Sequence, residues 1–157
     1  MTRIAVFSDL HGDSHRTMEA CFERFDYVAF LGDGLSKLRS FMYKYPEQFL
    51  YVRGNCDMYD NDAPLRLILD FDGVNVMLTH GHSERVKNGL IPLLVEAQVK
   101  KVQVVLFGHT HVPLIVEDSG VLLVNPGTAA SYYCEKGTYA ILTIDKGKYF
   151  AEIVKND

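Results

Sequence analysis

The chain has 157 residues, 48% of them hydrophobic, and a formal net charge of −4. This length suits one domain with its own core, so we expect a single domain over residues 1–157. No apolar run reaches the roughly 18 residues that span a membrane, and the N-terminus lacks the zones of a signal peptide, which predicts a cytoplasmic protein. The positive charges are scattered, so neither nucleic acid nor a membrane is an expected partner.

The cysteine pattern also agrees with a cytoplasmic protein. Cys21, Cys56 and Cys134 are widely spaced and form no C-x-x-C pair. An odd number of cysteines without a spacing framework argues against a disulfide-stapled secreted domain.

The first third of the chain alternates strand and helix patterns. We predict strands at residues 3–8, 27–31 and 48–52, and helices at residues 14–25, with Ser14 as a cap, and 36–43. This βαβαβ order implies parallel strands joined by right-handed crossovers.

The rest of the chain is dominated by hairpin patterns. We predict three hairpins, formed by strands 65–71 and 74–79, 114–117 and 121–124, and 138–144 and 149–154. A helix at 88–99 and a buried strand at 102–107 lie among them, and we expect this half to be mostly antiparallel. Many strands with few helices predict an α/β fold in which two sheets pack face to face with helices outside.

Polar residues follow the predicted strands in five glycine-containing loops, at residues 9–12, 32–34, 54–57, 79–82 and 108–111. Five of the six histidines lie in three of these loops. Because ligands of α/β sheets bind at the carboxyl ends of the strands, we expect these loops to converge on one site.

The donors in these loops suit divalent metal ions. They are Asp9, His11, Asp33, Asn55, His80, His109 and His111. Nitrogen and oxygen donors without a thiolate quartet favour manganese, iron, cobalt, nickel or zinc over a structural zinc knuckle. Seven ligands are too many for one tetrahedral ion but are enough for two ions that share a carboxylate. Such a centre keeps a net positive charge that favours a phosphate anion.

The motifs D-x-H, G-D, G-N-C-D, H-G-H and G-H-T-H, in this order, resemble the calcineurin-like metallophosphoesterase superfamily. The short length and the G-N-C-D spelling resemble its small YfcE-type phosphodiesterase branch. The resemblance runs from Arg3 to about Thr128. It implies a four-layer α/β/β/α sandwich of two mixed β-sheets flanked by helices, and it places residues 125–128 near the site. Small relatives often form dimers or tetramers, so a homo-oligomer is expected by analogy.

The resemblance also implies a role for each donor. Asp9, His11 and His111 would hold the first metal ion, and Asp33 would bridge to the second. Asn55, His80 and His109 would complete the second site. Manganese is the first choice of metal, with nickel, zinc, iron and cobalt as alternatives.

The expected activity is hydrolysis of a small phosphoester, most readily a phosphodiester. A hydroxide bridging the two metal ions would attack phosphorus in line with the leaving oxygen, and His11 and Asn55 would orient the substrate. Cys56 stands where many relatives have a histidine that protonates the leaving group. A thiol is the poorer proton donor, so we expect a preference for good leaving groups such as aryl esters. Asp57, His82 and metal-bound water stay open as proton sources.

Other interpretations stand beside this one. The chain could be a catalytically weak metal-binding scaffold of the same fold, as in the retromer scaffold subunit, and a nuclease would need a basic groove. Individually, Asp9 and Asp33 could be helix caps, Asn55 a turn former, and Cys56 an inert side chain. His82 could support a ligand or be merely exposed, and Asp13 and His15 could flank the entrance or only begin a helix. Tyr132 and Tyr133 could contact another subunit or stack on a substrate.

Overall fold

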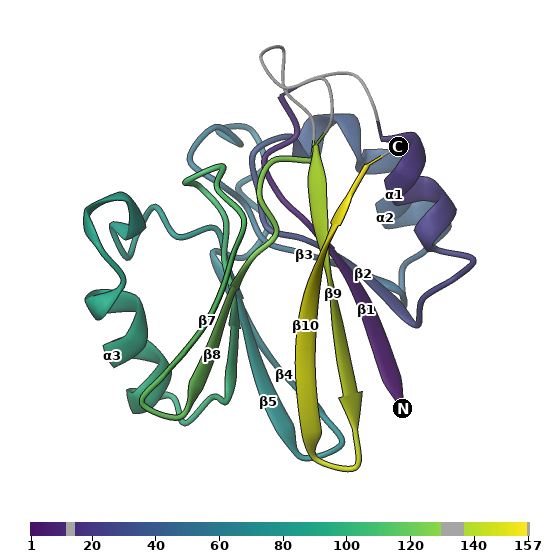
Figure 1. The fold of residues 1–157 in the computed structure, drawn as a ribbon. Coiled ribbons are helices and arrows are strands. Elements are labelled where there is room, and N and C mark those ends of the chain that lie inside the picture. Colours follow the sequence, from purple (N-terminus) through teal and green to yellow (C-terminus); the bar gives the residue numbers. More distant parts are fainter. Residues whose placement is uncertain (12–14, 130–136, 157) are drawn as a thin grey trace.

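Two five-stranded sheets form the centre of the protein in the part of the chain that the structure describes (Figure 1). The structure is a computed structural model that describes residues 1–11, 15–129 and 137–156. The first sheet has the spatial order β10 (Lys148–Lys155), β9 (Thr138–Asp145), β1 (Thr2–Phe7), β2 (Tyr27–Phe30) and β3 (Phe49–Tyr51). The second has the order β4 (Arg66–Phe71), β5 (Val74–Thr79), β6 (Val104–Leu106), β8 (Val121–Asn125) and β7 (Leu114–Asp118).

Both sheets are mixed. Strands β1, β2 and β3 are parallel, while β9 runs antiparallel to β1 and β10. In the second sheet, β5, β6 and β8 are parallel, and each outer strand is antiparallel to its neighbour. All three predicted hairpins are therefore confirmed. The expected antiparallel character of the second half is wrong for β5, β6 and β8, because α3 (Ile91–Val99) carries the chain back between β5 and β6.

Helices cover the outer faces of the two sheets. Helices α1 (Arg16–Cys21) and α2 (Arg39–Lys44) flank the first sheet, and α3 lies on the opposite side of the molecule (Figure 1). Two 3₁₀ turns, η1 (Leu35–Lys37) and η2 (Val86–Asn88), precede α2 and α3. Among the described residues, no helix is long and apolar enough to cross a membrane.

Three separate cores show that there are four layers. Phe7 and Phe30 pack with Phe41 between the first sheet and its helices. Val6 and Leu78 belong to the core between the two sheets. The third core places Met77 and Val105 of the second sheet against Leu93 of α3. The structure confirms the expected α/β/β/α sandwich.

Three predicted helices differ from the observed ones. The helix expected over 14–25 ends at Cys21, although Phe22 and Phe25 are still buried, and its expected cap, Ser14, lies outside the described residues. The helix expected over 36–43 is divided into η1 and α2. The helix expected over 88–99 begins at Ile91, because Gly89 has φ 130°, outside the helical range, and Pro92 then occupies the first turn.

Candidate metal centre

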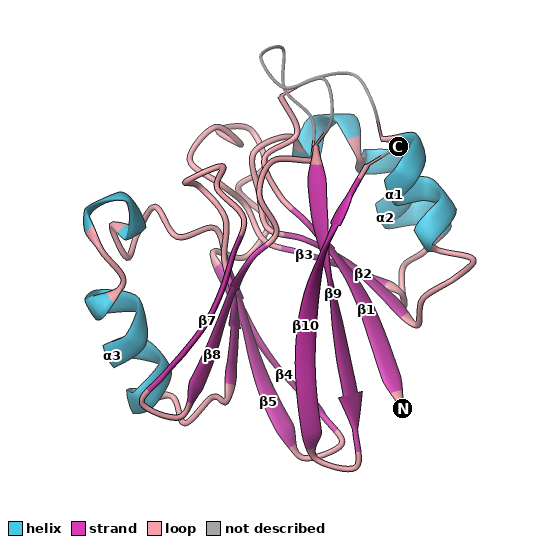
Figure 2. Ribbon diagram, in the orientation of Figure 1, coloured by secondary structure: helices cyan, strands magenta, loops and turns pink. Residues whose placement is uncertain are grey.

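The site loops meet at the carboxyl ends of the parallel strands. Figure 2 shows loops gathered at this end of the sandwich. Backbone hydrogen bonds tie neighbouring loops together, from the Asp9 N–H to the Gly32 carbonyl at 3.0 Å and from the Gly108 N–H to the His80 carbonyl at 2.9 Å. Residues that lie far apart in the sequence are thereby brought within reach of one another.

Asp9, His11 and His111 form the first ligand group, and their ligand atoms all lie within 4.8 Å of one another. Asp9 Oδ1 is 3.2 Å from His111 Nε2 and 3.8 Å from His11 Nε2. Asp9 is fully buried, and its Oδ2 accepts hydrogen bonds from the Ser8 hydroxyl at 2.6 Å and the His109 N–H at 3.0 Å. Its Oδ1 is buried and accepts no hydrogen bond from the described residues. A buried carboxylate oxygen that faces two imidazoles fits a cation.

Asp33, His80 and His109 form the second ligand group, again within 4.8 Å of one another. His80 Nδ1 donates to the Leu31 carbonyl at 2.7 Å, which fixes the tautomer and leaves Nε2 facing the site. That Nε2 lies 3.2 Å from both Asp33 Oδ2 and His109 Nδ1. It is also 3.8 Å from Asp9 Oδ1, so the two groups adjoin.

The ionisable side chains in and around the second ligand group shift one another's pKa values. Burial by itself would raise the pKa of the Asp33 carboxyl. Hydrogen bonding and positive charge from His80, with the Cys56 N–H, outweigh burial and hold that pKa well below its usual range. The pKa of His80 is raised, because Asp33 and Asp9 outweigh the opposing effect of its burial. Burial, and then the charge of His80, lower the pKa of His82 and of His109. Asp33 is thus held in the ionised form that a metal ion requires.

The backbone at the site is strained. Asp9, Asp33, His109 and His111 have φ values of 57°, 66°, 72° and 64°, in the left-handed region that non-glycine residues rarely adopt. Strained residues of this kind persist where the surroundings over-determine them, and they cluster at functional sites. The neighbouring glycine Gly54 has no room for a side chain, because a Cβ there would strike the Asp33 carboxylate.

Asp57 holds the loops together. Its Oδ2 accepts from the N–H groups of Asp33 at 2.7 Å and Gly54 at 2.8 Å, and its Oδ1 accepts from those of Gly34 at 2.9 Å and Leu35 at 3.0 Å. Four backbone donors occupy both oxygens of this buried carboxylate. This geometry shows that Asp57 positions the Asp33 and Asn55 loops, and its catalytic role stays a prediction.

Asn55 and Cys56 lie on the same loop and are exposed. The Asn55 amide donates to Cys56 Sγ at 3.6 Å, and the Cys56 N–H donates to Asp33 Oδ1 at 2.7 Å. Burial and the negative charge of Asp33 raise the pKa of the Cys56 thiol. The metal-ligand role of Asn55 and the catalytic roles of His11, Asn55 and Cys56 stay predictions.

Residues of the 125–128 segment support the site through hydrogen bonds. Asn125 donates to the Gly108 carbonyl at 3.1 Å and to the Thr110 hydroxyl at 3.0 Å, which braces the loop of His109 and His111. Thr128 donates from its hydroxyl to the Asp9 carbonyl at 2.7 Å. The expected proximity of residues 125–128 to the site is confirmed, and these two contacts are its physical basis.

A second support lies in the loop that follows β5. Glu84 is buried and accepts hydrogen bonds from the Thr79 hydroxyl at 3.0 Å and from Arg66 Nε at 2.7 Å. These contacts join the loop after β5 to β4. In the sequence, Glu84 is only one of many acidic residues, so no local pattern marks it.

The remaining candidates divide between the site and its surroundings. The His82 ring centroid lies 5.4 Å from that of His80 and 6.3 Å from that of His109, beside the second group. His15 is the N-cap of α1, and its ring packs against Phe41 with the centroids 5.6 Å apart, which supports the interpretation that it only begins a helix. Asp13, Tyr132, Tyr133 and Cys134 lie outside the described residues.

Known proteins share both the sequence pattern and the fold. The sequence profile of the calcineurin-like phosphoesterase superfamily domain matches residues 2–147. The chain belongs to this superfamily. It is 29% identical over 148 residues to the probable metallophosphoesterase YsnB of Bacillus subtilis (strain 168), covering 90% of this chain and 84% of that protein. Over 86 residues, 52% of this chain and 45% of the relative, it is 31% identical to a Methanocaldococcus jannaschii phosphodiesterase.

Solved structures give the same result for the superfamily fold. A predicted phosphoesterase from Streptococcus pneumoniae TIGR4 superposes with a TM-score of 0.82 at 26% identity, covering 98% of this chain and 88% of that one. Vps29 of Entamoeba histolytica, crystallised with zinc, superposes with a TM-score of 0.72 at 19% identity, covering 98% of each chain, a likeness of fold alone. The resemblance in the sequence is therefore confirmed. Superfamily membership agrees with the two candidate metal groups and supports a hydrolase.

Proposed function

We propose that this protein is a phosphodiesterase that hydrolyses small phosphoesters with two divalent cations, one in each ligand group. One observation carries the proposal. The buried Asp9 Oδ1, without a hydrogen bond from the described residues, lies between the histidines of the first group and only 3.8 Å from His80 of the second. A relative named as a phosphodiesterase supports the substrate class.

The donors divide between the cations as the resemblance implies. Asp9, His11 and His111 hold one cation, Asp33 is shared, and Asn55, His80 and His109 hold the other. Two cations held in this way lower the pKa of bound water and stabilise negative charge on the phosphoryl oxygens. Manganese is the preferred ion, with nickel, zinc, iron and cobalt as alternatives, because imidazole and carboxylate donors suit all of them.

The exposure of the side chains suggests which of them fix the metal ions and which contact the substrate. His80 and Asp33 are buried and locked, so they hold their positions while substrate comes and goes. The side chain of His11 is 32% exposed, and Asn55 is also open to solvent. These two side chains can orient the phosphoester and donate hydrogen bonds to its oxygens as charge develops.

Cys56 sets the leaving-group preference in this proposal. It stands beside Asn55 and is exposed, at the position where many superfamily members have a histidine. A thiol protonates a departing alkoxide less well than an imidazolium, so aryl esters should be hydrolysed far better than unactivated alkyl esters. Similar turnover of aryl and alkyl diesters would contradict this role.

The test begins with metal-stripped protein and bis-p-nitrophenyl phosphate. Manganese, nickel, cobalt, zinc or iron is added back in turn, and His109→Ala is compared with His15→Ala, a histidine outside both groups. We expect metal-dependent hydrolysis that is lost in His109→Ala and kept in His15→Ala. Metal binding without hydrolysis of this diester or of p-nitrophenyl phosphate would instead support a scaffold of the same fold.

A further inference from the structure

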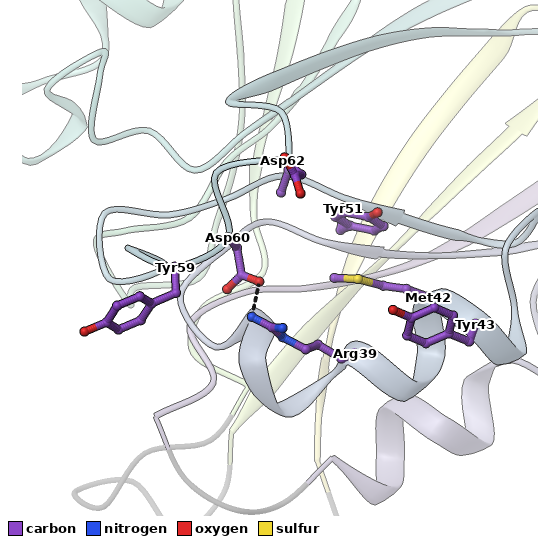
Figure 3. A pocket seen from close by; sticks show the side chains of 8 residues that line it. Arg39, Met42, Tyr43, Tyr51, Tyr59, Asp60 and Asp62 are labelled. Atoms are coloured by element: carbon purple, nitrogen blue, oxygen red, sulfur yellow. Dashed lines mark hydrogen bonds and ion pairs between the residues drawn. The ribbon is translucent and has the colours of Figure 1, made fainter.

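A hollow lies between α2 and the segment 59–63. It has a volume of about 180 Å³. Met42 and Tyr51 form its base, and Tyr43 and Tyr59 stand at opposite ends (Figure 3). Its size and aromatic lining fit one flat ring system.

The walls of this cavity continue directly from two metal-binding loops. Residues 39–43 follow the Asp33 loop through η1, and residues 59–63 follow the Asn55 loop. Asp57 joins both walls, because its carboxylate accepts from Asp33 and Leu35 while its carbonyl accepts from the Asp60 N–H at 3.2 Å. A substrate at the metal centre would have to extend along residues 56–59 to place a group in the cavity.

The chemistry of the cavity selects an aromatic group over another phosphate. Arg39 is paired with Asp60 at 3.0 Å, so its charge is already neutralised (Figure 3). Asp62, which is exposed, adds a carboxylate that repels anions and accepts N–H donors. Tyr43 and Tyr59 are 86% and 88% exposed, so their ring faces are available for stacking.

We propose that this cavity binds the aromatic group that stays on phosphorus during hydrolysis, either a nucleobase or a simple aryl ring. The proposal rests on the proposed function, since it places the scissile phosphate between the two ligand groups. The water oxygen bonds to phosphorus and the bond to the leaving oxygen breaks. The leaving oxygen takes the electron pair of that bond, a proton from the water balances its charge, and the aromatic group in the cavity stays on the monoester product. A nucleobase would differ from an aryl ring by donating an N–H to Asp62.

Three p-nitrophenyl diesters test this assignment, because they share a leaving group and differ only in the retained group. Their retained groups are methyl, phenyl and 5′-thymidyl. We expect the wild-type enzyme to prefer phenyl or thymidyl over methyl in kcat/KM. In Tyr43→Ala and Tyr59→Ala, that preference should fall at least about fivefold, with the methyl diester unaffected. Asp62→Asn should reduce only the thymidyl preference, and only if the occupant is a nucleobase.

Phe150→Ala is the matched control, because Phe150 is an exposed aromatic residue on β10, at the opposite edge of the same sheet from β3. It should change none of the three rates. Equal rates for the three diesters in the wild type, or an equal loss for all three in the tyrosine variants, would overturn the proposal.

Failure of the proposed function would look different, because none of the diesters would then be hydrolysed. Calorimetric binding of thymidine 5′-phosphate and phenyl phosphate, against methyl phosphate, would still test the cavity. Tighter binding of an aromatic monoester that is lost in Tyr43→Ala would support it, and equal binding of all three would reject it.

Discussion

The two ligand groups are built from similar residues, but their surroundings differ sharply. In the second group, His80 and Asp33 are buried, and both are already bonded to the protein. In the first group, His11 and His111 have side chains 32% and 44% exposed, and only Asp9 is buried. In the second group, two of the three ligands are locked and His109 is half-buried, whereas the first group combines one fixed carboxylate with two open imidazoles.

This difference suggests separate roles for the groups. A ligand set that is locked before the metal ion arrives loses little conformational entropy on binding, so we expect the second group to hold its ion more tightly. The first group must order two exposed side chains, and its ion should exchange more readily.

The largest effect is expected where the groups meet. Asp33→Ala removes the carboxylate that we assign to both cations and leaves His80 without its acidic partner. Because each site contributes several kcal/mol of charge stabilisation, hydrolysis of bis-p-nitrophenyl phosphate should fall at least about a thousandfold. Asp118→Ala, at the exposed end of β7, is the control and should keep full activity. A loss of less than about tenfold in Asp33→Ala would remove Asp33 from the centre.

Stability should separate the two groups clearly. In metal-free protein, His80→Ala leaves the buried Asp33 carboxylate without its ion-pair partner and the Leu31 carbonyl without its donor. We expect a loss of about 3 kcal/mol in the free energy of unfolding, measured by urea denaturation. His111→Ala, at an exposed position, should change it by less than about 0.5 kcal/mol. Equal losses in the two variants would show that the groups are equally preorganised.

A substitution at Gly54 tests whether Asp33 needs its observed position to bind the metal ion. A Cβ at Gly54 meets the Asp33 carboxylate and backbone, so Gly54→Ala must shift the ligand. We expect about a 10- to 100-fold loss in affinity at the second group, the size seen when partners of metal ligands are removed, measured by manganese titration. Gly120→Ala is the comparison, because a Cβ there meets nothing within 4 Å and the strain at its φ of 78° falls in the turn between β7 and β8. Unchanged affinity in Gly54→Ala would mean that Asp33 does not need its observed position.

The smallest effect is expected at the support of the first group. Asn125→Ala removes the donors to the Gly108 carbonyl and the Thr110 hydroxyl, which brace the loop of His111. The same loop carries His109 of the second group. We expect about a tenfold weaker first-group ion, at the low end of the effect of such supports, and a smaller loss at the second group, where His80 and Asp33 keep their own hydrogen bonds. Equal weakening of both ions would show that this loop supports the centre as a whole.

Much of this architecture could be predicted, for reasons that particular residues show. Asp72 and Gly73 mark a hairpin locally, and the polar residues after β1, β2 and β5 mark the strand ends. The parallel neighbours β5, β6 and β8 could not be deduced, because the hairpin pattern of β7 and β8 does not say which of the two lies beside β6. The role of Asp57 was hidden as well, since three of its four backbone donors, at Asp33, Gly34 and Leu35, lie more than twenty residues away.

The number of bound metal ions tests the central claim most directly. Metal-stripped protein would be titrated with manganese by calorimetry, with the bound metal counted by elemental analysis, in parallel with His111→Ala. We predict two ions per chain, the tighter one retained in His111→Ala and the weaker one lost. A single ion in the wild-type protein, or loss of the tighter ion in His111→Ala, would contradict a centre built from a locked group and an open one.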